Sequence, residues 1–418
     1  MSSIHTIATT DIDADGGRSS STITQKEIPK KQKIKRIAKD LFIRYWFLLG
    51  LGIAIGLAWA FPQVGKRYGS IQAQYTVKWG AVILIFLLSG LGLEVSVMFR
   101  TILQWRLHLV TQIVSFIVLP FVMYGICRFL IAVNANIDAS VYKGWIIALS
   151  TSTTVSSNAI MTRNANGSDS AALFNAALGN VLGIFLSPAL MTIFEKDSIL
   201  FQPGTAKGTP DYLNVLKNLG STVLAPLVVG QFIRYLFNQR VKIIAQKCRF
   251  SIINSLALLC LVWSVFCDGV ASDAFQKMSG VDIVAIIFVD IFMYLFGCLT
   301  CLTIARLPWP SKLIREPKWV EKCRFSRKDA IAIMYCGATK TVSMGIPLIN
   351  VLYSSSSYDV IGVLSLPLLM YHICQLFLGN FQVPLLKKWA EKDEEHSEEN
   401  SEILPNNTVQ LTTMRRRG

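Results

Sequence analysis

Long apolar stretches recur along most of the chain, separated by short polar segments. A bilayer core about 30 Å thick needs about 20 apolar residues per helix, and each of these stretches is long enough. The ten stretches lie at residues 41–61, 78–98, 107–131, 143–162, 170–194, 212–237, 250–268, 281–304, 329–352 and 359–382. The pattern therefore predicts an all-α polytopic membrane protein with ten transmembrane helices.

The composition agrees with a membrane protein. The chain has 418 residues, of which 52% are hydrophobic and only 16% are charged, and its mean hydropathy is +0.46. A soluble domain carries about 25% charged residues, so a soluble enzyme is excluded. No predicted span contains a nucleophile next to a base, or residues with metal-ligand spacing. We therefore expect neither catalysis nor a bound cofactor.

Basic residues set the expected orientation in the membrane. Lys and Arg outnumber Asp and Glu by 41 to 26, which gives a net charge of +15. They gather in short loops, as is typical of cytoplasmic loops beside an anionic leaflet rather than of a nucleic-acid groove. We therefore expect both termini in the cytoplasm and no nucleic-acid partner. The loops assigned to the cytoplasm are 99–106, 163–169, 238–249 and 305–328.

Polar segments flank the apolar part of the chain. Residues 1–39 are rich in Ser, Thr and Lys, and residues 386–418 are acidic and then basic. Neither segment has an apolar pattern able to bury a core, so both are expected to be disordered cytoplasmic tails. The transmembrane domain between them covers 40–385, with halves at about 40–195 and 211–382.

Two of the predicted spans are interrupted by hydroxyl-rich runs. Ser150–Asn158 lies in the fourth span, and Tyr335–Pro347 lies in the ninth. If the spans divide five plus five, each run is in the fourth helix of its half, and the odd number makes the halves inverted repeats. Helices broken at matching places in two such halves indicate a transporter site at the midplane. The alternative is that the hydroxyls only bond back to their own helix, which would explain a single run.

Few ionisable side chains lie within the predicted spans. Lys340 is inside the ninth-span run, and Asp290 is in the middle of the eighth span. Because a charge in hydrocarbon costs free energy, such groups usually face a cavity or a partner of opposite charge. We therefore predict that Lys340 is functional and that Asp290 is its charge partner, whereas His372 is expected to be a packing residue.

Four motifs in these spans give a family resemblance. They are Gly90–Glu94, Thr153–Asn158, Gly179–Asn180 with Ser187–Pro188, and Cys336–Thr341. Through them the chain resembles the bile acid:sodium symporter superfamily over residues 40–385, in the branch of the sodium/bile acid cotransporter 7-like proteins. Its polar tails and long basic loop are most similar to those of fungal members.

The resemblance implies a fold and an ion site. The family folds as ten helices in two inverted five-helix repeats, in which the fourth and ninth helices are broken and cross. It places a sodium site around Ser157, Asn158 and Asn180. The family's ninth helix also brings a glutamate and, four residues later, a glutamine to sodium. The matching positions here hold Cys336 and Lys340, which argues against classical sodium coupling.

For this branch, the resemblance implies a plasma-membrane solute carrier that negatively regulates cytosolic calcium, with an unknown small solute or ion as substrate. The spans have too few acidic residues for a Ca²⁺ cage of about six to eight oxygens, so an indirect effect on calcium is favoured. The alternatives are a sodium-coupled organic-anion symporter and a non-transporting regulator that binds calcium-channel or calcium-signalling proteins. The candidate substrate- or ion-binding residues are Thr153, Thr154, Ser157, Asn158, Asn180, Asp290, Cys336, Thr339, Lys340 and Thr341.

Overall fold

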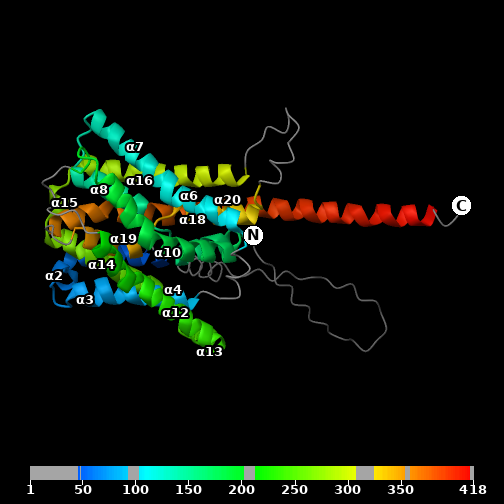
Figure 1. The fold of residues 1–418 in the computed structure, drawn as a ribbon, viewed down its shortest axis with the longest axis horizontal. Coiled ribbons are helices and arrows are strands. Elements are labelled where there is room, and N and C mark those ends of the chain that lie inside the picture. Colours follow the sequence, from blue (N-terminus) through cyan, green and yellow to red (C-terminus); the bar gives the residue numbers. More distant parts are fainter. Residues whose placement is uncertain are drawn as a thin grey trace, which may run out of the picture. The chain divides into compact units, whose positions relative to one another are not determined.

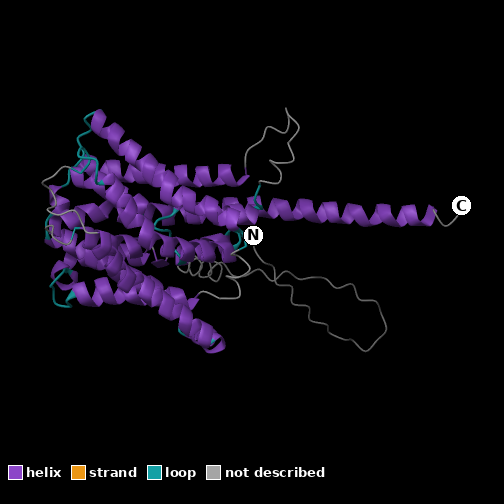
Figure 2. Ribbon diagram, viewed as in Figure 1, coloured by secondary structure: helices purple, strands orange, loops and turns teal. Residues whose placement is uncertain are grey.

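Helices make up all the regular structure of the described chain (Figure 2). The computed structural model describes residues 46–47, 49–92, 103–201, 212–306, 324–353 and 358–414. In this part of the chain, eight helices are long and apolar enough to cross a membrane, and Leu49–Ala60 is a shorter apolar helix. The prediction of an all-helical polytopic membrane protein is therefore confirmed, whereas the ten-helix inverted repeat stays a prediction.

The helices are grouped here into two sets (Figure 1), which also pack on each other through α14 and α20 and through α11 and α10. In the flanking set, α12 packs on α4, and α14 packs on α2 and α4. The flanking set comprises α2 (Pro62–Gly65), α3 (Ala73–Tyr75), η1 (Thr76–Ala81), α4 (Val82–Gly92), α11 (Tyr212–Leu219), η3 (Gly220–Leu224), α12 (Ala225–Leu236), α13 (Asn238–Lys247), α14 (Phe250–Ala271) and α15 (Ala274–Lys277).

The crossing set contains both of the interrupted spans. Here α20 packs on α8 and α16, and α18 packs on α16 and α6. The crossing set comprises α6 (Trp105–Ile113), η2 (Val114–Val118), α7 (Leu119–Ala132), α8 (Ala139–Ser150), α9 (Ser156–Asn164), α10 (Asp169–Phe194), α16 (Gly280–Arg306), α18 (Arg327–Ala338), α19 (Val342–Leu352) and α20 (Tyr358–Met414).

Both interrupted spans are broken in the structure. α8 ends at Ser150, and Thr151 has extended backbone angles, with φ −78° and ψ 166°. α18 ends at Ala338, and Thr339 is also extended, with φ −87° and ψ 155°. The hydroxyls of both threonines donate to a backbone carbonyl of the helix that they end. Such local bonds compete with the helical ladder, and each hydroxyl-rich run therefore separates two half-helices.

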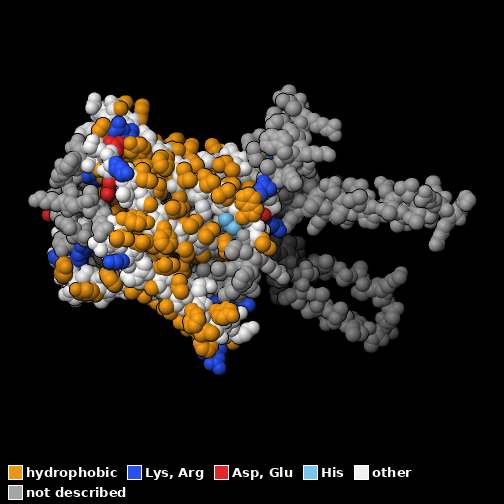
Figure 3. All heavy atoms as spheres, viewed as in Figure 1, with side chains coloured by type: hydrophobic (Ala, Val, Ile, Leu, Met, Phe, Trp, Pro, Cys, Tyr) orange, Lys and Arg blue, Asp and Glu red, His pale blue; other side chains and the backbone are white. Residues whose placement is uncertain are grey.

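The broken span Arg327–Leu352 lies in the interior of the crossing set. The apolar part of this span is fully buried inside the protein, whereas only 33% of the apolar part of α16 is buried. On α16, Phe288 and Phe292 remain exposed, as expected for a helix that faces lipid. Figure 3 shows hydrophobic side chains spread over the visible face of the helices. The polar break therefore lies away from lipid, where irregular backbone is tolerated in a membrane protein.

Two glycines let α4 and α12 cross closely in the flanking set. A Cβ added to Gly90 would collide with the carbonyl oxygen of Leu227, and one added to Gly230 would collide with that of Leu87. Small residues at a crossing allow the backbones of membrane helices to approach. The Gly90 that belongs to the family motif is thus a packing residue, whereas Glu94 lies outside the described residues.

The last helix extends into the segment expected to be a C-terminal tail. α20 continues as a helix to Met414, beyond the predicted boundary of the membrane domain at 385. Residues 387–402 are rich in Lys and Glu, which are good helix formers, so the helix continues although it has no apolar stripe. The N-terminal tail predicted at 1–39 lies outside the described residues. That the tails are separable from the membrane domain stays a prediction.

Candidate functional site

The two broken helices meet at their hydroxyl-rich runs. The backbone nitrogen of Thr341, in the α18–α19 break, donates to the carbonyl oxygen of Ser152, in the α8–α9 break, at 2.8 Å. Beside this contact, the hydroxyl oxygens of Thr153 and Thr339 are 2.7 Å apart. All four residues are buried. The crossing is therefore made by the residues that the sequence analysis singled out.

Asn158 ties the hydroxyls of both runs together. Its Nδ2 donates to Thr153 Oγ1 at 2.7 Å, and its Oδ1 accepts from Thr154 at 2.9 Å and lies 2.9 Å from Thr339 Oγ1. Thr154 Oγ1 also lies 2.5 Å from Ser157 Oγ. We call these five residues the hydroxyl network. Their oxygens and amide converge on one small region, in which all but the half-buried Ser157 are buried.

Asn180 and Cys336 connect the crossing to α10. Asn180, which is on α10, accepts from Ser152 Oγ at 2.7 Å. Cys336 Sγ lies 3.4 Å from the Ala172 carbonyl oxygen of the same helix and 3.7 Å from Asn158 Nδ2. Asn180 therefore approaches the hydroxyl network through Ser152, and Cys336 contacts it directly.

Lys340 places its ammonium among oxygens that surround the α18–α19 break. Its Nζ donates to the carbonyl oxygen of Ser115 at 2.6 Å, to Ser115 Oγ at 3.0 Å and to the carbonyl oxygen of Thr151 at 3.0 Å. The nitrogen also lies 5.5 Å from the centroid of the Phe116 ring. The residue is fully buried. An ammonium has three donors, so these oxygens satisfy all of them.

The local backbone explains why a cation is held at this place. Thr151 follows the last residue of α8, where the carbonyls of a helix end carry a partial negative charge. Ser115 is in the π-helical turn η2, an irregularity often found at functional sites. Gln375 completes the break, because its side chain accepts from the Lys340 amide and donates to the Lys340 carbonyl, both at 2.7 Å.

The predicted charge pair between Lys340 and Asp290 is wrong. Asp290 Oδ1 accepts from Trp145 Nε1 at 3.1 Å, and its Oδ2 has no hydrogen-bond partner among the described residues. The reason is that the irregular backbone around Ser115 and Thr151 offers Lys340 enough acceptors without a carboxylate. Asp290 is fully buried on α16, outside the hydroxyl network.

Two residues of the site, Ser115 and Gln375, were not predicted from the sequence, whereas Ser152 lies within the predicted hydroxyl-rich run Ser150–Asn158. Gln375 carries a usable signal, because it is an amide inside an apolar span, three residues after His372. Its Nε2 lies 2.7 Å from His372 Nδ1, which is also 3.4 Å from the Lys340 carbonyl oxygen, so the histidine contacts the break both directly and through Gln375. Ser115 carries no such signal, because single serines are common in membrane helices and only the fold brings it to Lys340.

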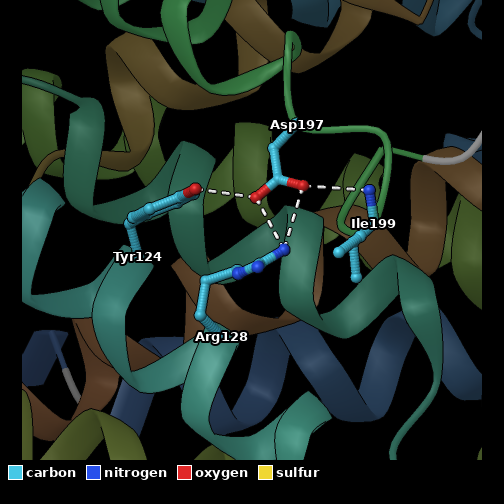
Figure 4. Close-up of polar contacts among 4 residues, drawn as sticks. All are labelled: Tyr124, Arg128, Asp197 and Ile199. Carbon is cyan, nitrogen blue, oxygen red and sulfur yellow. Dashed lines mark hydrogen bonds and ion pairs between the residues drawn. The ribbon is translucent and has the colours of Figure 1, made fainter.

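One edge of the crossing set is held by the ionic cluster in Figure 4. Asp197, just after α10, accepts from Tyr124 OH at 2.7 Å and pairs with the Arg128 guanidinium at 3.1 Å, both on α7. The backbone nitrogen of Ile199 also donates to it, at 2.9 Å. Burial raises the pKa of Asp197, but the hydrogen bonds and the arginine outweigh it and hold the pKa below its usual value. The cluster thus fixes α7 to the end of α10.

Polar contacts also join the two helix sets beside the broken helices. On α14, Asn254 Nδ2 donates to Oγ of Ser156, the first residue of α9, at 2.8 Å. The Arg67 guanidinium, which follows α2, donates to Asn350 Oδ1 on α19. Within the flanking set, the Arg67 backbone nitrogen donates to Asp268 Oδ1 on α14 at 2.6 Å, which fixes the loop that reaches α19. Any sliding of one set along the other must break the Asn254–Ser156 and Arg67–Asn350 contacts.

Comparison with known proteins gives consistent matches over nearly the whole described chain. The profile of the SBF-like CPA transporter family (DUF4137) matches residues 45–388. Solute carrier RCH1 of Candida albicans is 30% identical over 380 residues, 86% of this chain and 92% of that protein. Solute carrier RCH1 of Saccharomyces cerevisiae is 33% identical over 371 residues, 83% of this chain and 85% of that protein. Sodium/bile acid cotransporter 7 of Rattus norvegicus is 28% identical over 357 residues, 85% and 95% of the two chains.

Proposed function

We propose that this chain, which belongs to the SBF-like CPA transporter family and is a multi-pass membrane solute carrier, moves its solute by alternating access about the crossing of α8–α9 and α18–α19. The observation that carries the proposal is the hydroxyl network, where residues of two broken helices converge beside the break that contains the buried Lys340. Broken helices at the midplane are the usual ion and substrate sites of secondary transporters.

The motion that we propose is a displacement of the crossing set against the flanking set. The contacts Asn254–Ser156 and Arg67–Asn350 join the sets at the broken helices, so they would open and close as the site changes sides. We further propose ten spans in two inverted five-helix halves, with both termini in the cytoplasm. In this arrangement Leu49–Ala60 is part of the first span, and α8 and α9 together make the fourth.

We propose that the carrier is not classically sodium-coupled. The Lys340 ammonium binds backbone oxygens of Ser115 and Thr151, which are the kind of ligand that a sodium ion uses. Two unit charges 4 Å apart repel by about 4 kcal/mol at an effective dielectric constant of 20. A sodium ion at this position would therefore compete with a fixed cation that cannot leave.

We infer that the physiological output is restraint of cytosolic calcium influx at the plasma membrane, through a solute other than calcium. The resemblance to the sodium/bile acid cotransporter 7-like branch supports this role, and fungal solute carriers are among the relatives. The buried ammonium supports an indirect mechanism, because a fixed positive charge beside the hydroxyl network disfavours a divalent cation there.

Complementation tests the proposal. The chain is expressed in fungal cells that lack their own related carrier and grow poorly at high calcium, beside a variant with Thr339→Val. This change keeps the shape of the side chain and removes the hydroxyl that joins Thr153 and Asn158. Thr303→Val, on the exposed face of α16, is the matched control.

We expect the unmutated chain and Thr303→Val to restore growth, and Thr339→Val to fail although it is folded and reaches the membrane. Size-exclusion chromatography of the detergent-extracted protein checks folding. Full growth with Thr339→Val would contradict a role of the hydroxyl network in function. Failure of the unmutated chain to restore growth would contradict the calcium role.

A further inference from the structure

One carboxyl group is enclosed in the crossing set with a single hydrogen-bond donor among the described residues. Asp290 lies within the span formed by α16, and its side chain is 0% exposed. Trp145 Nε1 on α8 donates to its Oδ1 at 3.1 Å, and its Oδ2 has no partner in the described part of the chain. An ionised carboxylate here would keep an unsatisfied oxygen and an uncompensated charge, and both cost free energy inside a membrane protein. The surroundings of Asp290 therefore favour the neutral acid.

The groups that face Asp290 from α20 and from its own helix are uncharged. Tyr371 and Cys374 on α20 interact with it electrostatically, and ordinary tyrosine and cysteine side chains are neutral at pH 7. His372, which is also on α20, lies against the α18–α19 break instead. One turn along α16, Tyr294 donates its hydroxyl to α20 at 2.9 Å. The described part of α20, which packs on both α16 and α8, thus brings Asp290 no counter-ion.

The buried cations of this part of the crossing set are held elsewhere. Lys340 gives its donors to the oxygens around the α18–α19 break. On α8, Lys143 Nζ lies 5.8 Å from the centroid of the Phe201 ring. On α7, the thiol of Cys127 lies 3.9 Å from the carbonyl oxygen of Tyr142. With these groups engaged, a proton is the cation that neutralises the carboxylate.

Two contacts connect this carboxyl group to the crossing. Trp145 is on α8, the half-helix that ends at Ser150 beside the crossing. Tyr371 OH donates to the carbonyl oxygen of Ala338, the last residue of α18, at 2.7 Å. A movement of either half-helix therefore changes the surroundings of Asp290, and with them the free energy of its ionised form.

We propose that Asp290 is the proton-binding site of the carrier and that transport is coupled to the proton bound there. A proton from water on one side of the membrane forms an O–H bond at Oδ2, and the neutral acid is enclosed as in this structure. When the exchange of solute at the crossing moves α8 or α20, water reaches the acid, the O–H bond breaks and the proton passes to water on the other side. This inference rests on the proposed alternating access, and it gives the carrier a driving ion other than sodium.

Infrared spectroscopy of the purified full-length chain in detergent tests the proton site without any solute. The C=O stretch of a protonated carboxyl group is separate from the bands of an ionised one, so the proton itself is the probe. Asp290→Asn keeps an oxygen acceptor for Trp145 and cannot bind a proton. The matched control is Asp273→Asn, which changes an exposed carboxylate at φ 54°, a backbone conformation that asparagine adopts readily.

We expect a protonated-carboxyl band at pH 7 in the unmutated chain and in Asp273→Asn, and its loss in folded Asp290→Asn. The same band in Asp290→Asn, or no such band in the unmutated chain, would overturn the proton site. If Asp290→Asn does not fold, Trp145→Phe keeps the acid and removes its donor, so the frequency of the band should shift. An unshifted band in Trp145→Phe would then overturn the assignment to Asp290.

Liposomes with a pH-sensitive dye inside test the coupling. The probes are radiolabelled organic anions, amino acids and inorganic ions, added with and without an imposed gradient of one pH unit. For one proton per solute, the gradient should change accumulation by up to about tenfold with the unmutated chain and with Asp273→Asn, but not with Asp290→Asn. Uptake by the unmutated chain that ignores the gradient and leaves the internal pH constant would overturn the coupling and leave alternating access intact. Uptake of no solute would contradict alternating access instead, and the infrared band would still decide whether Asp290 holds a proton.

Discussion

Replacing Lys340 by methionine separates the function of the crossing from its stability. Methionine has a similar length and no charge, so the substitution removes the ammonium without leaving a large cavity. The donors to the carbonyl oxygens of Ser115 and Thr151 are lost. We expect the variant to fold and to lose its ability to restore growth at high calcium.

The magnitude follows from two opposing terms. A buried acceptor without a donor costs about 1–3 kcal/mol, and two carbonyls are affected. Removing a buried charge recovers a desolvation penalty of several kcal/mol per ion. The two terms nearly cancel, so we expect the free energy of unfolding to change by less than about 2 kcal/mol. For a chain of 418 residues, 1 kcal/mol shifts the unfolding temperature by about 1 °C, so we expect a shift of less than about 2 °C.

The assay pairs growth with thermal unfolding of the detergent-extracted protein. Lys340→Arg is the charge-preserving control, and its planar guanidinium does not match the three oxygens around a compact ammonium, so we expect partial growth. Full growth with Lys340→Met would refute the role of the cation. Loss of folded protein in that variant would refute the cancellation of the two stability terms.

Three further predictions follow from the described contacts. Lys340→Gln replaces the cation by an uncharged oxygen ligand, so sodium should raise the unfolding temperature of this variant and not that of the unmutated chain; a sodium effect in neither would contradict this. Asp197→Asn removes the Arg128 pair and should cost about 1 kcal/mol at pH 6. The pKa of Asp197 is lowered in the folded chain. The ionised carboxylate therefore stabilises the fold at a pH above 3.8, the usual pKa of the group, and this stabilisation is lost as the pH falls below that value. The difference in unfolding temperature between the unmutated chain and Asp197→Asn should therefore be smaller at pH 3 than at pH 6. An equal difference at both pH values would refute the stabilising role of the Asp197 carboxylate. Gly230→Ala places a Cβ against the backbone of α4 and should destabilise by about 1–3 kcal/mol, whereas Gly220→Ala, with nothing within 4 Å, should be neutral in the same assay.

The parts of the fold that the sequence predicts are those governed by local pattern. The length of the apolar stretches is sufficient to predict most of the membrane helices, and the clustered hydroxyls of Ser150–Asn158 are sufficient to predict a break. Both effects act within one segment of chain, so no knowledge of neighbouring helices is needed. The resemblance then indicates which polar runs cross.

The partner of Lys340 depends on the three-dimensional arrangement and could not be predicted in this way. Asp290 is the obvious counter-ion by charge, but the acceptors are a π-helical carbonyl at Ser115 and a helix-end carbonyl at Thr151. Backbone oxygens are present at every position and leave no trace in the sequence. The continuation of α20 through the charged segment to Met414 was missed for a related reason, because helix propensity without an apolar stripe is a weak signal.

A solute screen on the purified chain in liposomes tests the central claim most directly. Vesicles with the unmutated chain, with Lys340→Met and without protein are exposed to radiolabelled organic anions, amino acids and inorganic ions, once in sodium and once in choline. We predict that at least one solute accumulates with the unmutated chain, equally in both media, and not with Lys340→Met. Uptake that requires sodium, or that persists with Lys340→Met, would contradict the proposal that the Lys340 ammonium takes the place of a sodium ion. Uptake of no solute would contradict the proposal of alternating access at the crossing.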